Sequence, residues 1–257
     1  MKKMFAYLSA LIFLLACWQG SSVLLDKAFL PDVGATIVSF GENWLNGALP
    51  QALMISLRRI FWGIFWAVIL AVPFGLALGR IEKLDSFCAP LIYVLYPLPK
   101  VVFLPIIVVF LGLGDAPKIL LIALVVFFQI LVVSRDAAKN IPAEYDEVMQ
   151  VLHANAWERI KHVIVPYCLS DILTSLRITL GTGIAILFFA ETFASVNGLG
   201  YFILNGMESR NYPQMYAGII ALALLGLGMY VLVDITEKYC CRWSRCRWKR
   251  PCRRCRR

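Results

Sequence analysis

The side chains of this 257-residue sequence that could do chemistry are few, and most are polar residues inside apolar stretches. Gln129, Arg177, Thr182 and Glu191 each lie in a run that is otherwise long and apolar. Polar groups in hydrocarbon are costly, so they must face protein or water, and they often line the path of a solute. These four residues are therefore candidate pathway residues. The alternatives are a structural hydrogen bond to a neighbouring helix for Glu191 and snorkelling to the membrane surface for Arg177.

A second group of reactive side chains lies at the carboxyl end. Five of the eight cysteines fall between residues 240 and 255, and Cys252 and Cys255 have the C-x2-C spacing of half a zinc site. No histidine lies in this part of the sequence, and its many arginines would repel a cation. Solvated thiols on the reducing side of a membrane are the expected state, and a metal site at this pair is the alternative.

The composition shows what surrounds these residues. Hydrophobic residues make up 60% of the chain, charged residues 16%, and the mean hydropathy is +0.75. A soluble domain has about 25% charged residues. The high hydrophobic fraction and the low charged fraction exclude a soluble enzyme, a secreted disulfide scaffold and a disordered chain. They predict an all-α membrane protein with about six transmembrane helices.

The predicted spans follow the charge-free runs. Residues 1–25 form the first, either as an uncleaved helix, which we expect, or as a signal-like segment whose Cys17 would be lipidated. The third predicted span, Leu91–Leu113, contains Pro97, Pro99 and Pro105, so it should be kinked or broken. The spans after the first are Ile60–Gly79, Leu91–Leu113, Ile119–Ser134, Ile172–Ala194 and Tyr212–Val233.

The distribution of basic residues orients these spans. With six crossings, 18 Lys and Arg residues lie on the side of the two termini and five on the opposite side. The positive-inside rule places both termini in the cytoplasm. Ten of the 18 lie in the basic, cysteine-rich tail of residues 237–257, which should contact anionic lipid rather than nucleic acid.

The longest connection between predicted spans, residues 136–170, has the pattern of two short helices. Pro142 opens the first, with carboxylates in its first turn that suit a helix N-terminus. Asn155 and Glu158 have the capping-box spacing for the second, which Pro166 should end. The pattern predicts either a docking site for a soluble partner or helices lying on the bilayer surface.

This connection resembles the EAA loop of binding-protein-dependent ABC importer permeases. Glu147 and Pro166 have the spacing of that motif, and His153 stands where the motif usually has the glycine of the bend. His153 must therefore adopt a left-handed conformation or change the bend. Further segments resemble the nitrate/sulfonate/taurine branch of these permeases, over about residues 50–235: Tyr96–Val101, Leu104-Pro105, Gly112–Asp115, Leu176–Ile178, Ala190-Glu191 and Gly198–Tyr201.

The resemblance implies a fold, and together with the predicted spans and charges it divides the chain. The fold is the type I ABC importer permease bundle. After the first transmembrane helix at 1–25, an extracytoplasmic loop spans 26–52, the permease core spans 53–236 with its coupling loop at 136–170, and the cytoplasmic tail follows.

The resemblance also assigns two sets of site residues. The ATPase-coupling residues are Glu144, Glu147, His153, Ala154, Trp157 and Pro166. The periplasmic gate residues are Gly198, Gly200 and Tyr201.

The implied partners are an ABC ATPase subunit, an extracytoplasmic solute-binding protein, a second permease copy that forms a homodimer with this one, and the lipid bilayer. The sequence has no G-x-x-x-x-G-K-[ST] phosphate loop. ATP and Mg²⁺ therefore belong to the partner ATPase, and this chain is expected to bind no cofactor and to be a non-catalytic subunit.

The predicted function is that of a multi-pass permease in the inner membrane of a bacterium. It would pass a small solute, such as a sulfonate, nitrate or a taurine-like compound. The alternatives are an importer permease for a heterocyclic vitamin precursor, an ATP-independent channel or secondary transporter, and a membrane redox or metal enzyme built on the tail thiols.

Overall fold

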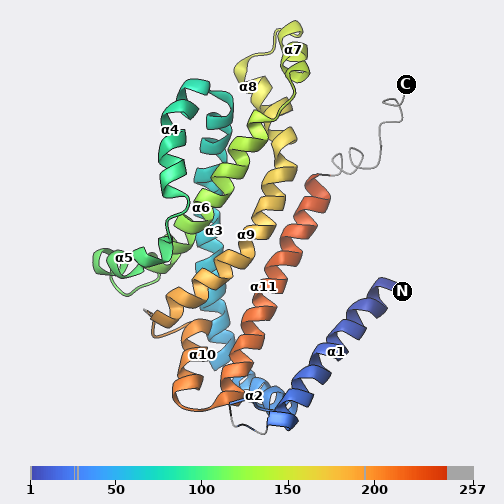
Figure 1. Cartoon of the computed structure of the whole chain (residues 1–257), viewed down its shortest axis with the longest axis vertical. Coiled ribbons are helices and arrows are strands. Elements are labelled where there is room, and N and C mark those ends of the chain that lie inside the picture. The colour runs from blue at the N-terminus through green and yellow to red at the C-terminus, as the bar shows by residue number, and fades with distance from the viewer. Residues whose placement is uncertain (1, 26, 28, 194, 242–257) are drawn as a thin grey trace. The chain divides into compact units, whose positions relative to one another are not determined.

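The computed structural model describes residues 2–25, 27, 29–193 and 195–241, and its regular elements are all helical. The predicted all-α fold is confirmed. The helices (Figure 1) are α1 (Lys2–Leu25), α2 (Val33–Leu45), α3 (Ala48–Arg80), α4 (Glu82–Leu95), η1 (Lys100–Phe103), α5 (Leu104–Leu111), α6 (Ala116–Lys139), α7 (Ala143–Val151), α8 (Ala156–Arg159), η2 (Ile160–Ile164), α9 (Val165–Phe193), α10 (Leu199–Glu208) and α11 (Tyr212–Cys240).

The chain divides into two compact units. The first contains residues 1–58 and 188–225, and the second contains residues 59–187 and 226–257. Helices α3, α9 and α11 contribute residues to both units.

Among the described residues, four helical segments are long and apolar enough to cross a membrane. They are α3, α6, Ala156–Phe193 and α11. The pair formed by α4 and Lys100–Leu111 is a fifth if the bent pair is one span, and α1 has a shorter apolar part, Ile12–Leu25. These six segments follow the order of the six predicted spans.

The third predicted span is broken, as the prolines predict. The two parts of the pair meet at an angle of 82°, at the Pro97–Pro99 segment. A broken helix leaves carbonyl groups without partners. Lys100 satisfies them, because its Nζ donates to the carbonyl oxygens of Leu95 at 3.0 Å, Tyr96 at 2.7 Å and Leu98 at 3.3 Å. The break is therefore a capped and defined turn.

In the second unit, α3 packs closely on α6 through small residues. A Cβ added at Gly63 would lie 2.6 Å from Ile122 Cγ2, and one added at Gly75 would lie 2.7 Å from the carbonyl oxygen of Leu131. Only glycine fits such contacts, which are typical of helices that approach closely in membranes. This packing gives the second unit a rigid α3–α6 pair.

In the first unit, α2 lies within the predicted 26–52 loop and follows α1 through a short turn. Trp18 Nε1 donates to the carbonyl oxygen of Pro31 at 3.1 Å, and the rings of Trp18 and Tyr216 lie 5.4 Å apart. Asp32 caps α2 by accepting from the backbone N–H of Ala35 at 2.7 Å. These contacts attach α1 to α2 and to the start of α11.

Candidate functional site

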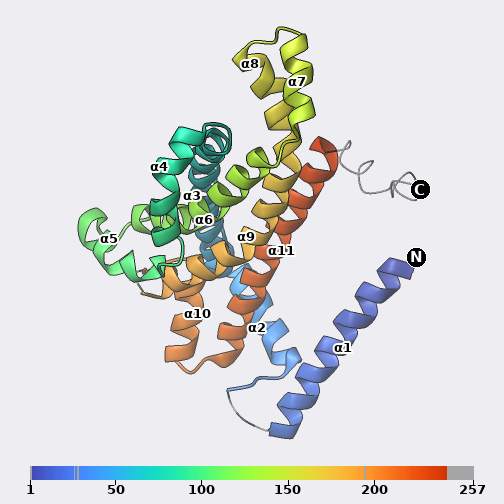
Figure 2. The same cartoon turned by 45° about the horizontal axis from the view of Figure 1, so that its top comes forward.

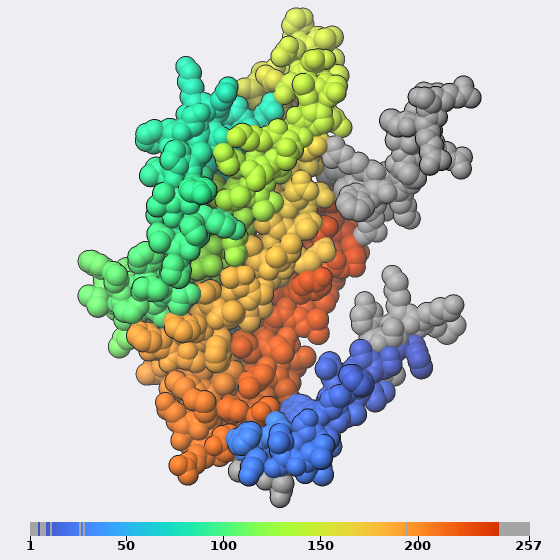
Figure 3. Space-filling view, in the orientation of Figure 1, coloured from blue at the N-terminus to red at the C-terminus, as the bar shows by residue number. Residues whose placement is uncertain are grey.

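The two predicted loop helices are present as α7 and α8, at the end of the second unit. They project beyond the ends of α4 and α6 in both cartoon views (Figures 1 and 2) and stand out in the space-filling view (Figure 3). Pro142 is the N-cap of α7, as predicted.

The bend between α7 and α8 is built around His153. Its φ of 50° is left-handed, which is one of the two outcomes the sequence predicts. The backbone N–H of Ala154 donates to the carbonyl oxygen of Met149 at 3.0 Å, and that of His153 donates to Gln150 at 2.9 Å. This pair of bonds is a Schellman motif, in which the left-handed position is usually glycine. His153 keeps the bend of the motif at a conformational cost.

The capping box of the second loop helix is also confirmed. Asn155 Oδ1 accepts from the backbone N–H of Glu158 at 2.9 Å, and Glu158 Oε2 accepts from the backbone N–H of Asn155 at 2.8 Å. The side chains therefore satisfy backbone donors at the start of α8.

The expectation that Pro166 ends this helix is wrong. Ala156–Phe193 is one long span, in which α8 continues through the π-helical η2 into α9. The backbone N–H of Val165 donates to the carbonyl oxygen of Ile160, five residues back. A proline clashes with the carbonyl four residues before it, and the wider π turn accommodates it. The coupling loop is thus directly continuous with a membrane span.

The coupling residues present a mixed acidic and apolar surface. Glu144, Glu147 and His153 are exposed, whereas Ala154 and Pro166 are half-buried. Trp157 is 68% exposed and Val151 79% exposed. Exposed apolar side chains beside carboxylates, outside the predicted spans, are typical of a surface that binds another protein.

A salt-bridge cluster braces this loop against α3. Asp146, on α7, accepts from Arg80, the last residue of α3, at 2.6 Å and from Arg159, on α8, at 2.9 Å. The hydrogen bond from Arg80, with a smaller contribution from Arg159, lowers the pKa of Asp146 against the opposing effect of burial. Asp146 therefore ties three helices together as a carboxylate.

A second cluster joins α4 to α6 near their loop ends. Asp85 is bound by Arg135, with 2.9 Å between Nη2 and Oδ2, and by Lys139 at 2.6 Å. Neither cluster could be predicted from the sequence, because nothing in the local pattern indicates partners that lie 50 to 66 residues apart.

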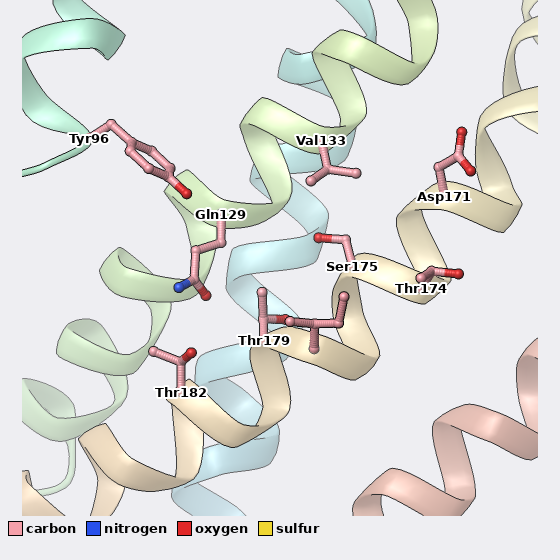
Figure 4. Close-up of a pocket in the computed structure, with 9 residues that line it drawn as sticks. Tyr96, Gln129, Val133, Asp171, Thr174, Ser175, Thr179 and Thr182 are labelled. Carbon is pink, nitrogen blue, oxygen red and sulfur yellow. The ribbon is translucent and has the colours of Figure 1, made fainter.

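Two of the four candidate pathway residues line one cavity of about 440 Å³ in the second unit (Figure 4). They are Gln129, on α6, and Thr182, on α9. Most of the remaining lining is also polar, and it includes Tyr96, Asp171, Thr174, Ser175 and Thr179. Its size falls within the range of about 300–1,000 Å³ that is usual for small-molecule sites.

Arg177 lies against α11 instead of lining this cavity. Its guanidinium pairs with Glu237, approaches Asp234 Oδ1 at 3.3 Å, and lies 5.7 Å from the ring centre of Tyr230. An arginine one to two turns into a span thus has carboxylate partners on a neighbouring helix. Its predicted pathway role stays a prediction.

Glu191 lies in the first unit and is fully buried. Its carboxylate accepts from Ser56 Oγ at 2.8 Å and from the backbone N–H of Gly200 at 2.8 Å. Ser56 Oγ in turn accepts from the backbone N–H of Leu199 at 2.8 Å. These are structural hydrogen bonds to neighbouring helices, the predicted alternative to a cavity role for Glu191.

The predicted gate residues form the start of α10. Gly198 is its N-cap with a φ of 101°, which favours glycine. A Cβ added at Gly200 would lie 2.5 Å from Glu191 Cβ and 2.8 Å from the carbonyl oxygen of Phe188. Tyr201 is exposed. The glycines therefore let α10 dock on the end of α9, and their role as a gate stays a prediction.

Two basic residues that opposed the predicted orientation have specific partners. Arg59 is buried, and its Nε donates to Asp115 Oδ1 at 2.8 Å. Lys118 is also buried and donates to the carbonyl oxygens of Leu113 at 3.0 Å and Gly114 at 2.9 Å. Both side chains are paired within the protein, so they count little in the positive-inside rule.

The alternative of a metal site in the tail concerns Cys252 and Cys255, which lie outside the described residues. Within the part of the chain that the structure describes, no group of three or more His, Cys, Asp or Glu side chains is placed to hold a metal ion.

Comparison with known proteins identifies the architecture. Residues 63–240 match the family described as binding-protein-dependent transport system inner membrane component. A chain of the MetNI methionine ABC transporter, solved in an inward-facing conformation, superposes with a TM-score of 0.65 at 17% identity, covering 76% of this chain and 97% of that one. At this identity, the likeness concerns the fold alone.

Two relatives cover most of the sequence. The taurine transport system permease protein TauC of Escherichia coli (strain K12) is 30% identical over 236 residues, which span 88% of this chain and 86% of TauC. The putative aliphatic sulfonates transport permease protein SsuC of Bacillus subtilis (strain 168) is 28% identical over 232 residues, which span 90% of this chain and 84% of SsuC. The chain therefore belongs to the family of binding-protein-dependent transport system inner membrane components, as a multi-pass, non-catalytic permease subunit of a bacterial ABC importer.

Proposed function

We propose that this permease forms the translocation pathway for a small sulfonate-like anion and that residues 144–166 couple it to a separate ATPase. The relatives that carry taurine and aliphatic sulfonates in their names support the substrate class. The likeness to a chain of a methionine ABC transporter supports an assembly with an ATPase, which would bind the ATP and Mg²⁺. A second copy of this chain and an extracytoplasmic solute-binding protein complete the proposed assembly.

The observation that carries the coupling role is the shape and surface of the α7–α8 loop. It projects from the second unit, exposes Glu147, Val151 and Trp157, and is braced to α3 through Asp146 and Arg80. A loop that only connected two spans would not need apolar side chains in water or a salt bridge at its base. A rigid, partly apolar surface is suited to transmit force from a soluble partner.

The continuity of α8 with α9 supplies the mechanism. Because Ala156–Phe193 is one span, movement of α8 by the ATPase would be passed to the part of α9 that lines the cavity. Closure of the ATPase pair around ATP would then tilt α9 and exchange an inward-open cavity for an outward-open one.

The proposed coupling is tested by purification in mild detergent, followed by mass spectrometry of the associated proteins. The wild-type chain should bring down an ATPase, and Glu147→Lys should lose it while remaining in the membrane. Glu42→Lys is the matched control, because Glu42 is also an exposed acid and lies on α2, outside the coupling loop. Unchanged recovery of the ATPase with Glu147→Lys would contradict the docking role.

The substrate class is tested by ATP-driven uptake into proteoliposomes that contain the assembled importer and its binding protein. Uptake of a sulfonate supports the proposal, whereas uptake of a heterocyclic vitamin precursor in its place would replace the substrate class. Uptake without ATP would contradict an ATP-driven importer altogether.

A further inference from the structure

One wall of the cavity between α6 and α9 is mostly polar, and it is formed by one face of α9. Its α9 residues occur at Asp171, Thr174, Ser175, Ile178, Thr179 and Thr182, which is the i, i+3, i+4 spacing of one helix face. Figure 4 shows Ser175, Thr179 and Thr182 on the side of α9 that faces Gln129 and Tyr96, with Thr174 and Asp171 farther along the helix. Such a wall offers several hydroxyl groups to a passing solute, of which that of Thr179 already donates to the carbonyl oxygen of Leu176 at 3.0 Å.

A smaller cavity of about 260 Å³ adjoins this one, since Tyr96 and Gln129 line both. The smaller cavity is also lined by Lys100. Three carbonyl oxygens hold the Lys100 ammonium, and it lies 4.6 Å from the ring centre of Phe128. The ammonium is therefore a fixed positive charge that acts on a solute through space, reduced in part by the carbonyl dipoles around it.

The opposite end of the α9 row carries a negative charge. Asp171 is the one carboxylate among the described residues that line the larger cavity. It lies across from Tyr96 and Gln129 in Figure 4 and 11 residues before Thr182, or about 16 Å along a helix. The two adjoining cavities thus have a positive pole at Lys100, in the smaller one, and a negative pole at Asp171, in the larger one.

Gln129 stands where the two cavities meet, and its hydrogen-bonding capacity is not used by the protein. Its Oε1 is buried and has no hydrogen-bond partner among the described residues. An unpaired buried polar atom costs about 1–3 kcal/mol, so a bound group that pairs with the carboxamide is favoured. The carboxamide can serve as a donor or an acceptor, because its terminal torsion is soft and two-fold.

We propose that this cavity is a transit site for a small zwitterion that carries an oxyanion and an ammonium group, such as an aminosulfonate. Its oxyanion is directed to the Tyr96–Gln129 end, in the field of Lys100, and its ammonium to the Asp171 end. The inference rests on the proposed function, because it assumes that the permease passes sulfonates. It adds the residues within the membrane subunit that orient the solute and the reason why a plain sulfonate fits less well.

Two probes of nearly equal size test the site: 2-aminoethanesulfonate, which is a zwitterion, and ethanesulfonate, which is a plain anion. Saturation-transfer NMR on the full chain, purified with its associated ATPase, reports the binding of each probe through its methylene protons. The wild-type chain should favour the zwitterion. Asp171→Asn should reduce that preference by about threefold, since it removes one charge at an exposed position where water screens it.

Two further variants complete the test. Gln129→Glu places a negative charge at the positive pole and should weaken the signals of both probes. Asp136→Asn is the matched control, because Asp136 is an exposed acid on α6 outside the residues that line the cavity, and it should leave the preference unchanged.

The outcomes separate this inference from the proposed function. Three results would each overturn the transit site: no saturation transfer to either probe, no preference for the zwitterion in the wild-type chain, or a preference in Asp171→Asn that is the same as in the wild-type chain. ATP-driven sulfonate uptake by the same preparation would leave the proposed function standing in those cases. Loss of that uptake in the wild-type importer would instead reject the proposed function.

Discussion

The carboxylate of Glu191, near the end of α9, accepts a hydrogen bond of 2.8 Å from the backbone N–H of Gly200, at the start of α10. The first N–H groups of a helix have no partners within the helix, and its N-terminus carries a partial positive charge. Glu191 and the Ser56 hydroxyl satisfy two of these groups, on Gly200 and Leu199. A charged residue in an apolar span thus anchors a short helix.

Glu191→Ala should loosen α10. The buried N–H of Gly200 would lose its acceptor, and an unpaired buried donor costs about 1–3 kcal/mol. We expect amide hydrogen exchange in α10 to become about tenfold faster or more. Glu208→Ala is the control, because Glu208 is an exposed acid at the other end of α10. Equal exchange in the two variants would contradict the anchoring role.

His153→Gly should stabilise the coupling loop. The left-handed conformation of His153 costs about 1 kcal/mol relative to glycine. Hydrogen exchange in α7 should therefore slow in the glycine variant, and it should become faster in His153→Val, since a β-branched residue is strained at this φ. The exchange rate in His153→Asn should lie between those of the glycine and valine variants. A glycine variant with faster exchange would mean that the His153 side chain itself stabilises the bend.

Asp146→Asn should release the coupling loop from α3. The variant loses the charge that pairs with both Arg80 and Arg159. We expect a lower Tm at neutral pH and faster exchange in α7 with little change in α10. Asp136→Asn is a suitable control, since Asp136 is exposed and 3.6 Å from its partner. Unaltered exchange in α7 would show that the brace contributes nothing.

The same salt bridge gives a pH dependence whose sign follows from the lowered pKa of Asp146. A carboxyl group with a lower pKa in the folded state stabilises the fold above its ordinary pKa of 3.8. The contribution is lost as the pH falls through the lowered value. The difference in Tm between the wild-type chain and Asp146→Asn should thus shrink on acidification below pH 3.8, as a pH series of thermal unfolding would measure.

The pairing of Arg177 with Glu237 should be reversible by exchange of the two charges. Arg177→Glu alone brings like charges together beside Asp234 and should lower the Tm of the purified protein. Adding Glu237→Arg should recover part of the loss. Lys83→Glu, at an exposed position on α4, controls for the change in net charge. A double variant no more stable than the single one would argue against this pair as a stabilising contact.

The sequence by itself determined the features that depend on neighbours along the chain. The Pro97–Pro99 break and the capping box of Asn155 and Glu158 follow from backbone geometry and short-range hydrogen bonds. For His153 the sequence left two outcomes open, and the structure has the left-handed one. The family resemblance was also readable, because it rests on the order and spacing of short motifs. The end assigned to the helix at Pro166 was wrong, since a π turn relieved the local clash that the prediction used.

The tertiary structure alone decided which distant residues meet. Ser56 and Glu191 are 135 residues apart, and Arg80 and Asp146 are 66 apart. It also brought Gln129 and Thr182 to one cavity and Arg177 to α11. A polar residue in an apolar span must find a partner, but its identity depends on how the helices pack and on which faces they turn to one another. Helix packing is set by the summed contacts of many side chains, and no local pattern encodes it.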